Sequence, residues 1–251
     1  MDQNLFNYTL RLADNALILG HRLSEWCGHA PILEQDIALS NIALDLIGQA
    51  RNLFQYAAEI ENAGRTEDDL AYLRDVFAFR NCLLVEQPNG DFAATVVRQC
   101  LFSAFALPFF EKLAAQTSDE TLRGISEKAV KELAYHLRWS SEWVIRLGDG
   151  TEESHRRTQA AVDNLWQFTG ELTTPDDLDF AADTEGFGVD LNEIKKAFDL
   201  KINAVFAQAT LEKPTDSWQQ SGGKRGVHSE HLGYLLAEMQ FLQRVYPNAH
   251  W

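Results

Sequence analysis

The stretch "KELAYHLRWSSEW", residues 131–143, places polar side chains in an otherwise apolar pattern of helical period. Four residues make little more than one helical turn, so Glu132 and His136 share a face, with Tyr135 and Trp139 beside them. A carboxylate and an imidazole on one apolar face are the ingredients of a buried metal site. The stretch therefore predicts a helix, and it raises the question of whether that helix binds metal.

The helical period continues outward from this stretch over almost the whole chain. Helices are expected near residues 4–27, 33–61, 67–85, 91–115, 118–147, 152–172, 190–211 and 229–245. The third of these is predicted to begin after Thr66, a plausible N-cap, with Asp69 at its third position. "EQPNG" (86–90) is a sharp break, and residues 173–190 and 213–227 are expected to be irregular.

The fold class that this pattern predicts is all-α. Four long helices joined by short breaks favour an antiparallel helical bundle, and no segment alternates long enough to be a convincing strand. We expect a single domain over residues 1–251, with a core bundle at about 4–147 and a C-terminal helical extension at about 150–251. The second and fourth long helices, 33–61 and 118–147, are predicted to be central because they look apolar on most sides.

Composition excludes several kinds of partner. The formal net charge of −15 argues against nucleic acid or an anionic membrane as a general partner. The most apolar run, "CLFSAFALPFF" (100–110), is too short to span a bilayer, and no secretory signal is visible at the N-terminus. Three cysteines without C-x-x-C spacing are typical of reduced thiols. We therefore expect a cytoplasmic protein.

The residue spacing argues against a metal centre. Di-iron bundles use one Glu from each of two helices and a Glu-x-x-His pair from each of the other two. One such pair occurs here, Glu152 and His155, at a helix start where the helix dipole favours acidic residues. Glu132 and His136 are spaced one residue wider, which turns His136 by about 100° around the helix axis. Tyr135 takes the ligand position instead.

The positions on the other long helices that would correspond to di-iron ligands can be located, and most of them carry residues other than the required Glu and His. The degenerate set is Asp14, Asp45, Gly48, Gln99, Glu132 and Tyr135, with His136 displaced by one position. It has the outline of a di-iron site and lacks both histidines. We therefore expect this chain to hold no metal.

Simpler interpretations of the same residues remain open. Asp45 and Gly48 fit a solvated stripe of their helix as well as they fit an inward face. Lys128, one turn before Glu132, predicts a salt bridge and a polar cluster with His136 in place of a metal site. The other candidate pair, His228 and His231 in "HSEHLG", is expected to consist of capping and surface residues.

Several long blocks resemble one known family from end to end. They are "SEWCGHAPILEQDIALSNIALDLIGQARN" (24–52), "LLVEQPNGDFA" (83–93), "KELAYHLRWS" (131–140) and "GGKRGVHSEHLGYLLAEMQFLQRVYP" (222–247). These blocks are similar to the non-catalytic C subunits of bacterial phenylacetyl-CoA epoxidase, a ring-1,2 monooxygenase of phenylacetate breakdown. The resemblance implies a ferritin-like fold.

The resemblance also implies partners and cofactors outside this chain. In the family, the catalytic A subunit holds the di-iron centre, and the C subunit is its direct structural partner. A small B subunit bridges the assembly, and a reductase with flavin and an iron–sulfur cluster delivers electrons from NADPH. In this implied role the chain itself contains no catalytic residue and holds no cofactor, and the missing ligands agree with it. Two other classes stay open from the residues alone: an independent ferritin-like di-iron oxidase or oxygenase, and a metal-free bundle that binds a small molecule.

Two short stretches are implied to contact the CoA part of phenylacetyl-CoA at the boundary with the A subunit. They are "AFRN" and "FAA", which comprise Ala78, Phe79, Arg80, Asn81, Phe180, Ala181 and Ala182. Arg80 and Asn81 have the chemistry to contact a phosphate or adenine. The alternative is that the two stretches are only a helix end and a surface loop.

Overall fold

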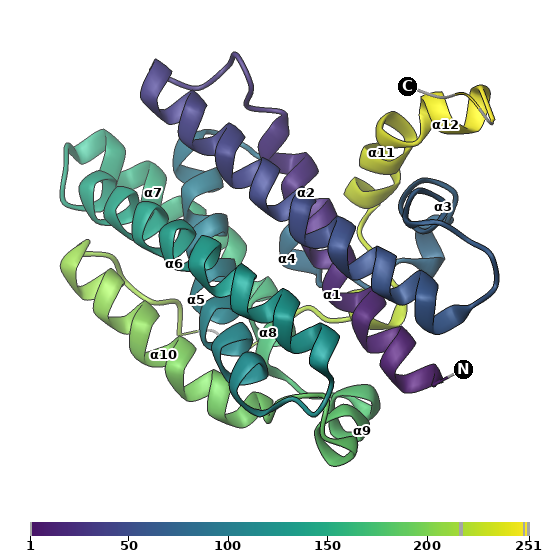
Figure 1. Cartoon of the computed structure of the whole chain (residues 1–251). Coiled ribbons are helices and arrows are strands. Elements are labelled where there is room, and N and C mark those ends of the chain that lie inside the picture. The colour runs from purple at the N-terminus through teal and green to yellow at the C-terminus, as the bar shows by residue number, and fades with distance from the viewer. Residues whose placement is uncertain (1, 216–217, 248, 250–251) are drawn as a thin grey trace. The chain divides into compact units, whose positions relative to one another are not determined.

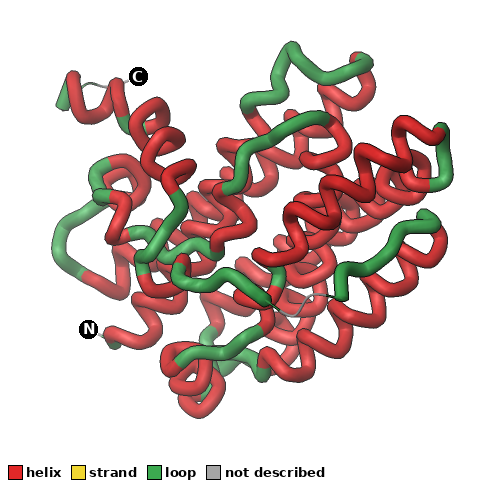
Figure 2. The backbone as a smooth tube through the Cα atoms, turned by 180° about the vertical axis from the view of Figure 1, so that it is seen from behind, coloured by secondary structure: helices red, strands yellow, loops and turns green. Residues whose placement is uncertain are grey.

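The computed structural model describes residues 2–215, 218–247 and 249, and these residues form helices and loops without any strand (Figure 2). The predicted fold class, an all-α ferritin-like helical bundle, is confirmed. The chain divides into two compact units, residues 1–88 with 221–251 and residues 89–220, and each is described by itself. This division differs from the core and extension expected at about residue 150, and the single domain stays a prediction.

The first unit is built on the helix pair α1 (Gln3–Ser24) and α2 (Leu33–Glu61), which run side by side (Figure 1). The side chain of Asp2 accepts a hydrogen bond from the Leu5 amide and caps α1. The two helices pack closely at Gly20, where an added Cβ would lie 3.0 Å from the Ile47 side chain. Short elements complete the unit: α3 (Glu67–Tyr72), η1 (Val76–Ala78), α4 (Leu83–Glu86), η3 (Gly223–Arg225), α11 (Glu230–Met239) and α12 (Phe241–Val245).

The second unit is built on α5 (Phe92–Gln116) and α6 (Glu120–Gly148), which also form a hairpin (Figure 1). The remaining elements are α7 (Glu152–Leu165), η2 (Trp166–Phe168), α8 (Gly170–Thr173), α9 (Asp177–Glu185) and α10 (Leu191–Gln208). By length and composition α5 could cross a membrane, but 72% of its most apolar window is buried. Burial of this kind is also found in a core helix of a soluble protein.

The four long helices begin and end close to their predicted limits, whereas several shorter predictions are wrong. The predicted capping box at Thr66 and Asp69 is present, but α3 ends at Tyr72 instead of reaching residue 85. The segment beyond leaves the helix because its backbone amides bind α1: the Arg80 amide donates to Asp14, and the Cys82 amide donates to Asn15 at 2.8 Å.

Three further boundaries differ from the sequence predictions. Residues 173–190, expected to be a loop, contain α9, because Asp176 and Asp179 form a capping box that starts a helix. The helix expected over 152–172 is interrupted after Leu165 by η2 and α8. The helix expected over 229–245 is divided at Gln240 into α11 and α12.

Candidate functional site

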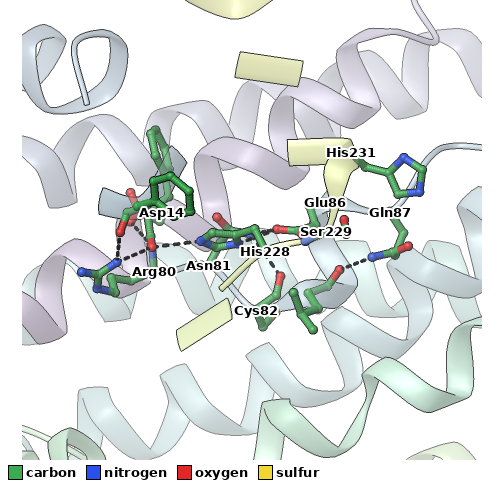
Figure 3. A network of polar contacts seen from close by, with 12 residues as sticks. Asp14, Arg80, Asn81, Cys82, Glu86, Gln87, His228, Ser229 and His231 are labelled. Atoms are coloured by element: carbon green, nitrogen blue, oxygen red, sulfur yellow. Dashed lines mark hydrogen bonds and ion pairs between the residues drawn. The ribbon is translucent and has the colours of Figure 1, made fainter. Parts of the chain in front are cut away.

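Asp14 on α1 lies in a buried polar network of the first unit (Figure 3). Its carboxylate accepts hydrogen bonds from both terminal nitrogens of Arg74, with Nη1 at 3.1 Å from Oδ2, and from the Arg80 backbone amide at 2.8 Å. Arg74 is itself buried, and its guanidinium lies 4.2 Å from the centre of the Phe79 ring. Asp14 and Arg74 therefore form a buried ion pair in which the carboxylate is fully engaged by N–H donors.

The network contains a second buried pair, Glu86 and His228, whose side chains are 0% and 2% exposed. The Glu86 carboxylate faces His228 Nδ1 at 2.8 Å and accepts hydrogen bonds from Asn81 Nδ2 at 2.9 Å and the Ser229 amide at 2.7 Å. In Figure 3 the imidazole lies between Glu86 and Arg80, and its Nε2 is 3.0 Å from the Phe79 carbonyl oxygen.

The acceptors around the imidazole limit the charge state of this second pair. A carbonyl oxygen only accepts, so Nε2 of His228 must carry a proton, and one further proton is shared between Nδ1 and the Glu86 carboxylate. Burial lowers the pKa of His228, but the hydrogen bond and negative charge of Glu86 outweigh it, helped by the Phe79 carbonyl and the charge of Asp14. The pKa of His228 is therefore raised above its ordinary value of 6.5, which favours an imidazolium–carboxylate pair.

Glycines explain how His228 reaches a segment so far away in sequence. An added Cβ at Gly223 would lie 2.2 Å from the Asn81 carbonyl oxygen, and one at Gly226 would lie 2.5 Å from the Phe77 carbonyl oxygen. Gly226 also has a φ of 81°, in the left-handed region that favours glycine. Only the glycines of "SGGKRG" let this loop lie against residues 77–83 and carry His228 to Glu86.

His228 was expected to be a capping or surface residue, and this expectation is wrong. Because Glu86 lies 142 residues away along the chain, helical spacing gave no signal of the pair. Glu86 and Arg74 were missed for the same reason, since their partners come from distant segments. His231 is half-buried, and its backbone carbonyl accepts a hydrogen bond from Arg22 at 3.3 Å. The pair Glu152 and His155 lies at the start of α7, where His155 Nδ1 lies 2.7 Å from the Gly148 carbonyl oxygen.

The predicted metal-like positions of the first unit do not fit a metal. Asp14 is engaged by Arg74, whose positive charge opposes a cation at the same carboxylate. Gly48 offers no side chain, and the place where its Cβ would lie is open space. Asp45 is half-buried on α2 and has contacts of its own.

The positions of the second unit do not fit a metal either. Gln99 is buried, and its side-chain amide donates to Ser103 Oγ at 2.9 Å. Glu132 keeps 19% of its side chain exposed and lies 3.9 Å from Lys128 Nζ. Tyr135 is half-buried and packs edge-on against the fully buried His136. Among the described residues, no three His, Cys, Asp or Glu side chains are placed to hold a metal ion.

Comparison with known proteins shows the family to which the chain belongs. The family described as "Phenylacetic acid catabolic protein" matches residues 1–251. The chain belongs to this family. It is 50% identical over 244 residues to the C subunit of the 1,2-phenylacetyl-CoA epoxidase of Escherichia coli (strain K12), and the match covers 97% of this chain and 98% of that protein. Because the match is nearly end to end, it includes both units of this member of the phenylacetic acid catabolic protein family.

The first stretch expected to contact CoA in this family member lies in the buried network. Phe79 and Asn81 are buried, and the Asn81 amide nitrogen donates to Glu86 and to the Cys82 carbonyl oxygen. Ala78 is half-buried, and its carbonyl oxygen accepts a hydrogen bond from Arg74. Arg80 is half-buried, and its Nη1 donates to the carbonyl oxygens of Phe77 and Phe79, both at 2.7 Å. Within the described part of the chain, the Arg80 side chain has no acidic partner.

The second stretch lies on α9 of the other unit. Phe180 is 57% exposed, Ala181 is half-buried and Ala182 is buried. The Ala182 carbonyl oxygen is taken by the amides of Phe187 and Gly188, at 3.0 and 2.8 Å. The exposed ring of Phe180 is therefore the main group that this stretch offers to another molecule.

Proposed function

We propose that this chain is the non-catalytic C subunit of a 1,2-phenylacetyl-CoA epoxidase and scaffolds its di-iron A subunit in the cytoplasm. In this proposal a B subunit bridges the assembly, and a reductase with flavin and an iron–sulfur cluster supplies electrons from NADPH. The near end-to-end match with the Escherichia coli protein supports the assignment. A scaffold of this kind acts by burying part of its partner's surface, which stabilises the partner by mass action.

The observation that carries the non-catalytic role is the state of Asp14. A di-iron centre needs carboxylates whose lone pairs are free for the metal, as in the Glu and Glu-x-x-His ligands of bundle enzymes. The Asp14 carboxylate is instead occupied by Arg74 and by the Arg80 amide. Binding of iron there would require expelling a buried guanidinium, which leaves an uncompensated charge in the core.

Iron analysis separates this proposal from an independent di-iron oxidase. The chain purified from iron-supplemented cells is expected to contain far less than one iron per molecule. The A subunit purified in parallel serves as the positive control. Close to two irons per chain would favour the di-iron oxidase and contradict the proposal.

Reconstitution tests the scaffold role directly. The measurement is NADPH-dependent consumption of phenylacetyl-CoA by the A, B and reductase subunits, with and without this chain. We expect no turnover by the chain alone and full epoxidation only when it is added. Asp45→Asn and His136→Gln variants that fold and assemble normally should keep this activity, because neither residue acts on oxygen in the proposal. A well-assembled His136→Gln complex without turnover would require a chemical role for α6.

We also propose that Arg80 contributes to binding the CoA part of the substrate. Its Nη1 is held by two carbonyl oxygens, which fixes the plane of the guanidinium, while Nε and Nη2 have no partner among the described residues. A fixed guanidinium with available N–H groups suits a phosphate oxygen. The amide nitrogen of Asn81 is already engaged inside the network. In the second stretch, which belongs to the other unit, Phe180 has an exposed ring that is a separate candidate for contact with CoA.

A further inference from the structure

Helix α2 carries apolar side chains on two opposite faces. One face packs in the first unit and buries residues such as Leu39, Ile42, Leu46, Leu53 and Phe54. The other face is open to solvent, with Leu33 72%, Ile37 52% and Leu44 66% exposed. Such side chains are normally buried in a soluble protein, and contiguous exposed ones mark interaction sites.

The exposed apolar residues lie in one stripe along the helix, which also carries the polar residue Asn41 between Ile37 and Leu44. Leu33 and Ile37 are four residues apart and Leu44 is seven further on, so all three point the same way. Gly48 continues the stripe by another turn, and nothing lies within 4 Å of the position its Cβ would take. At Gly48 there is thus no side chain between the backbone of α2 and a helix that approaches this face.

Helix α6 shows that this stripe is not a general property of long helices in the chain. It has the same length as α2, 29 residues, and a buried face of similar extent. Its exposed positions carry charged residues, among them Lys131, Arg138, Glu142 and Arg146. The expectation that both helices are covered on most sides is thus wrong for both, because each leaves one face exposed. The exposed face of α6 is charged and is compatible with water, whereas the exposed face of α2 is apolar and is compatible with a partner.

The charges beside the stripe indicate what kind of partner fits. Between Leu33 and Gly48 the helix carries Glu34, Asp36 and Asp45 and no Lys, Arg or His. The first basic residue beyond them is Arg51, whose Nε lies 3.5 Å from Glu67. A second copy of this chain would bring the same acids against them, and two chains of net charge −15 repel each other. A different polypeptide with basic residues around an apolar helix face is complementary to both the stripe and its rim.

We propose that the stripe Leu33–Ile37–Leu44–Gly48 of α2 is a docking surface for an amphipathic helix with basic flanks, contributed by another protein of the assembly. The proposal rests on the proposed function in taking the catalytic A subunit as that partner. The apolar residues form the centre of the interface and the acids form its rim, as in most protein interfaces.

The test compares two exposed leucines on different helices. Leu44→Asp places a charge at the centre of the stripe, and Leu200→Asp makes the same change on α10, where Leu200 is 75% exposed. Both variants should fold like the wild type, as checked by circular dichroism and thermal unfolding, and Leu44→Ala provides a milder change. Binding to the purified A subunit is measured by calorimetry. Leu44→Asp is expected to weaken binding at least about 30-fold, the loss typical of an interface hot spot, and Leu200→Asp to leave it unchanged.

A rim variant tests the charge argument. Glu34→Lys is expected to slow association with the A subunit by about threefold to tenfold at low salt, and the difference should vanish at high salt. Equal binding by wild type and Leu44→Asp would overturn the docking surface and leave the scaffold role standing. A wild-type chain that does not bind the A subunit would overturn the scaffold role and this partner together. Self-association that Leu44→Asp abolishes would overturn the choice of partner.

Discussion

Ion pairs occur both in the polar network of the first unit and on the face of α6 around Glu132, but they differ in how deeply they are buried. In the network, Asp14 pairs with Arg74 and Glu86 pairs with His228, and the four side chains are at most 6% exposed. On α6, Lys128 is 60% exposed and its Nζ lies 3.9 Å from Glu132. The buried pairs join residues 60 and 142 positions apart, whereas the α6 pair spans one turn.

This difference shows that burial, and not only the presence of opposite charges, decides how much an ion pair contributes to the free energy of unfolding. Removing one partner of a buried pair leaves a desolvated charge and costs about 3–5 kcal/mol. An exposed pair one helical turn apart contributes about 0.3–0.5 kcal/mol. The network should therefore determine the conformation of residues 74–86 and 228, and the α6 pair should add little to the stability of its helix.

The largest effect is expected from Asp14→Ala. The variant leaves the buried Arg74 without its carboxylate, so the free energy of unfolding should fall by about 3–5 kcal/mol. For a chain of this size the melting temperature should drop by roughly 6–20 °C. Urea and thermal unfolding measure both quantities. An unchanged melting temperature would mean that Arg74 finds another partner and that the network is not structural.

A double variant separates loss of the pair from loss of packing. Asp14→Leu combined with Arg74→Met removes both charges and keeps apolar volume, so it should be more stable than Asp14→Ala. If the double variant is the less stable of the two, the neutral hydrogen-bonding partners of Arg74, such as the Leu70 and Ala78 carbonyl oxygens, matter more than the ion pair.

The second effect is a pH dependence that originates at His228. Its folded pKa is raised above 6.5, so its contribution to stability is complete below pH 6.5 and is lost as pH rises through the folded pKa. Groups that face it are Glu86, Asp14 and the Phe79 carbonyl oxygen. The melting temperature should therefore fall from pH 6 toward alkaline pH, and His228→Gln should be less stable and lose this slope.

His21 on α1 provides a control of opposite sign. Burial lowers the pKa of His21 to about 4, so this side chain stays neutral in the folded protein over the range where His228 acts. The stability associated with neutral His21 is lost as pH falls from 6.5 toward 4, because His21 binds a proton in the unfolded chain before it does so in the folded chain. His21→Gln should reduce the fall in melting temperature toward acid pH and leave the fall toward alkaline pH unchanged. If it instead removed only the alkaline fall, the two histidines would have been assigned to the wrong sides of the pH profile.

A smaller effect, on substrate binding, is expected from Arg80→Gln. Arg80 lies at the edge of the network and has no acidic partner among the described residues, so its loss should not leave a carboxylate unpaired. Loss of a charge-assisted hydrogen bond to a CoA phosphate should raise the KM for phenylacetyl-CoA about tenfold, with little change in kcat. The assay is the reconstituted epoxidase. Arg146→Gln, the same charge change on the exposed face of α6, is the control and should leave the KM unaltered.

The fold could be predicted largely from sequence because it depends on local patterns. Apolar periodicity located the four long helices to within a few residues, and capping residues such as Thr66 and Asp69 marked a true helix start. The short elements were harder. Residues 73–82 have helical character in the sequence, but their backbone amides and Arg74 bind side chains of α1 instead, which no local pattern reveals.

The candidate site could be predicted only in its outline. The missing histidines were visible from spacing alone, and so was the Lys128–Glu132 pair, because both depend on residues within one helix. The pairs Asp14–Arg74 and Glu86–His228 depend on how distant segments pack, and the glycines of residues 222–226 that permit this packing look like an ordinary loop in the sequence. His228 therefore looked like a surface residue.

The smallest effect is expected from Glu132→Ala on α6. Had Glu132 been buried beside Lys128 or His136, its removal would cost about 3–5 kcal/mol, as for Asp14. Because Glu132 is only partly buried, at 19% exposed, and its Lys128 partner is 60% exposed with Nζ 3.9 Å away, we expect a loss of about 1 kcal/mol, well below that for Asp14. A double-mutant cycle with Lys128→Ala isolates the pair, whose coupling should be about 0.3–0.5 kcal/mol and should decrease with salt. The same cycle at Asp14 and Arg74 should give a coupling several times larger. If Glu132→Ala instead destabilised the chain as much as Asp14→Ala, α6 would contain a second buried polar centre, and the contrast between the two regions would disappear.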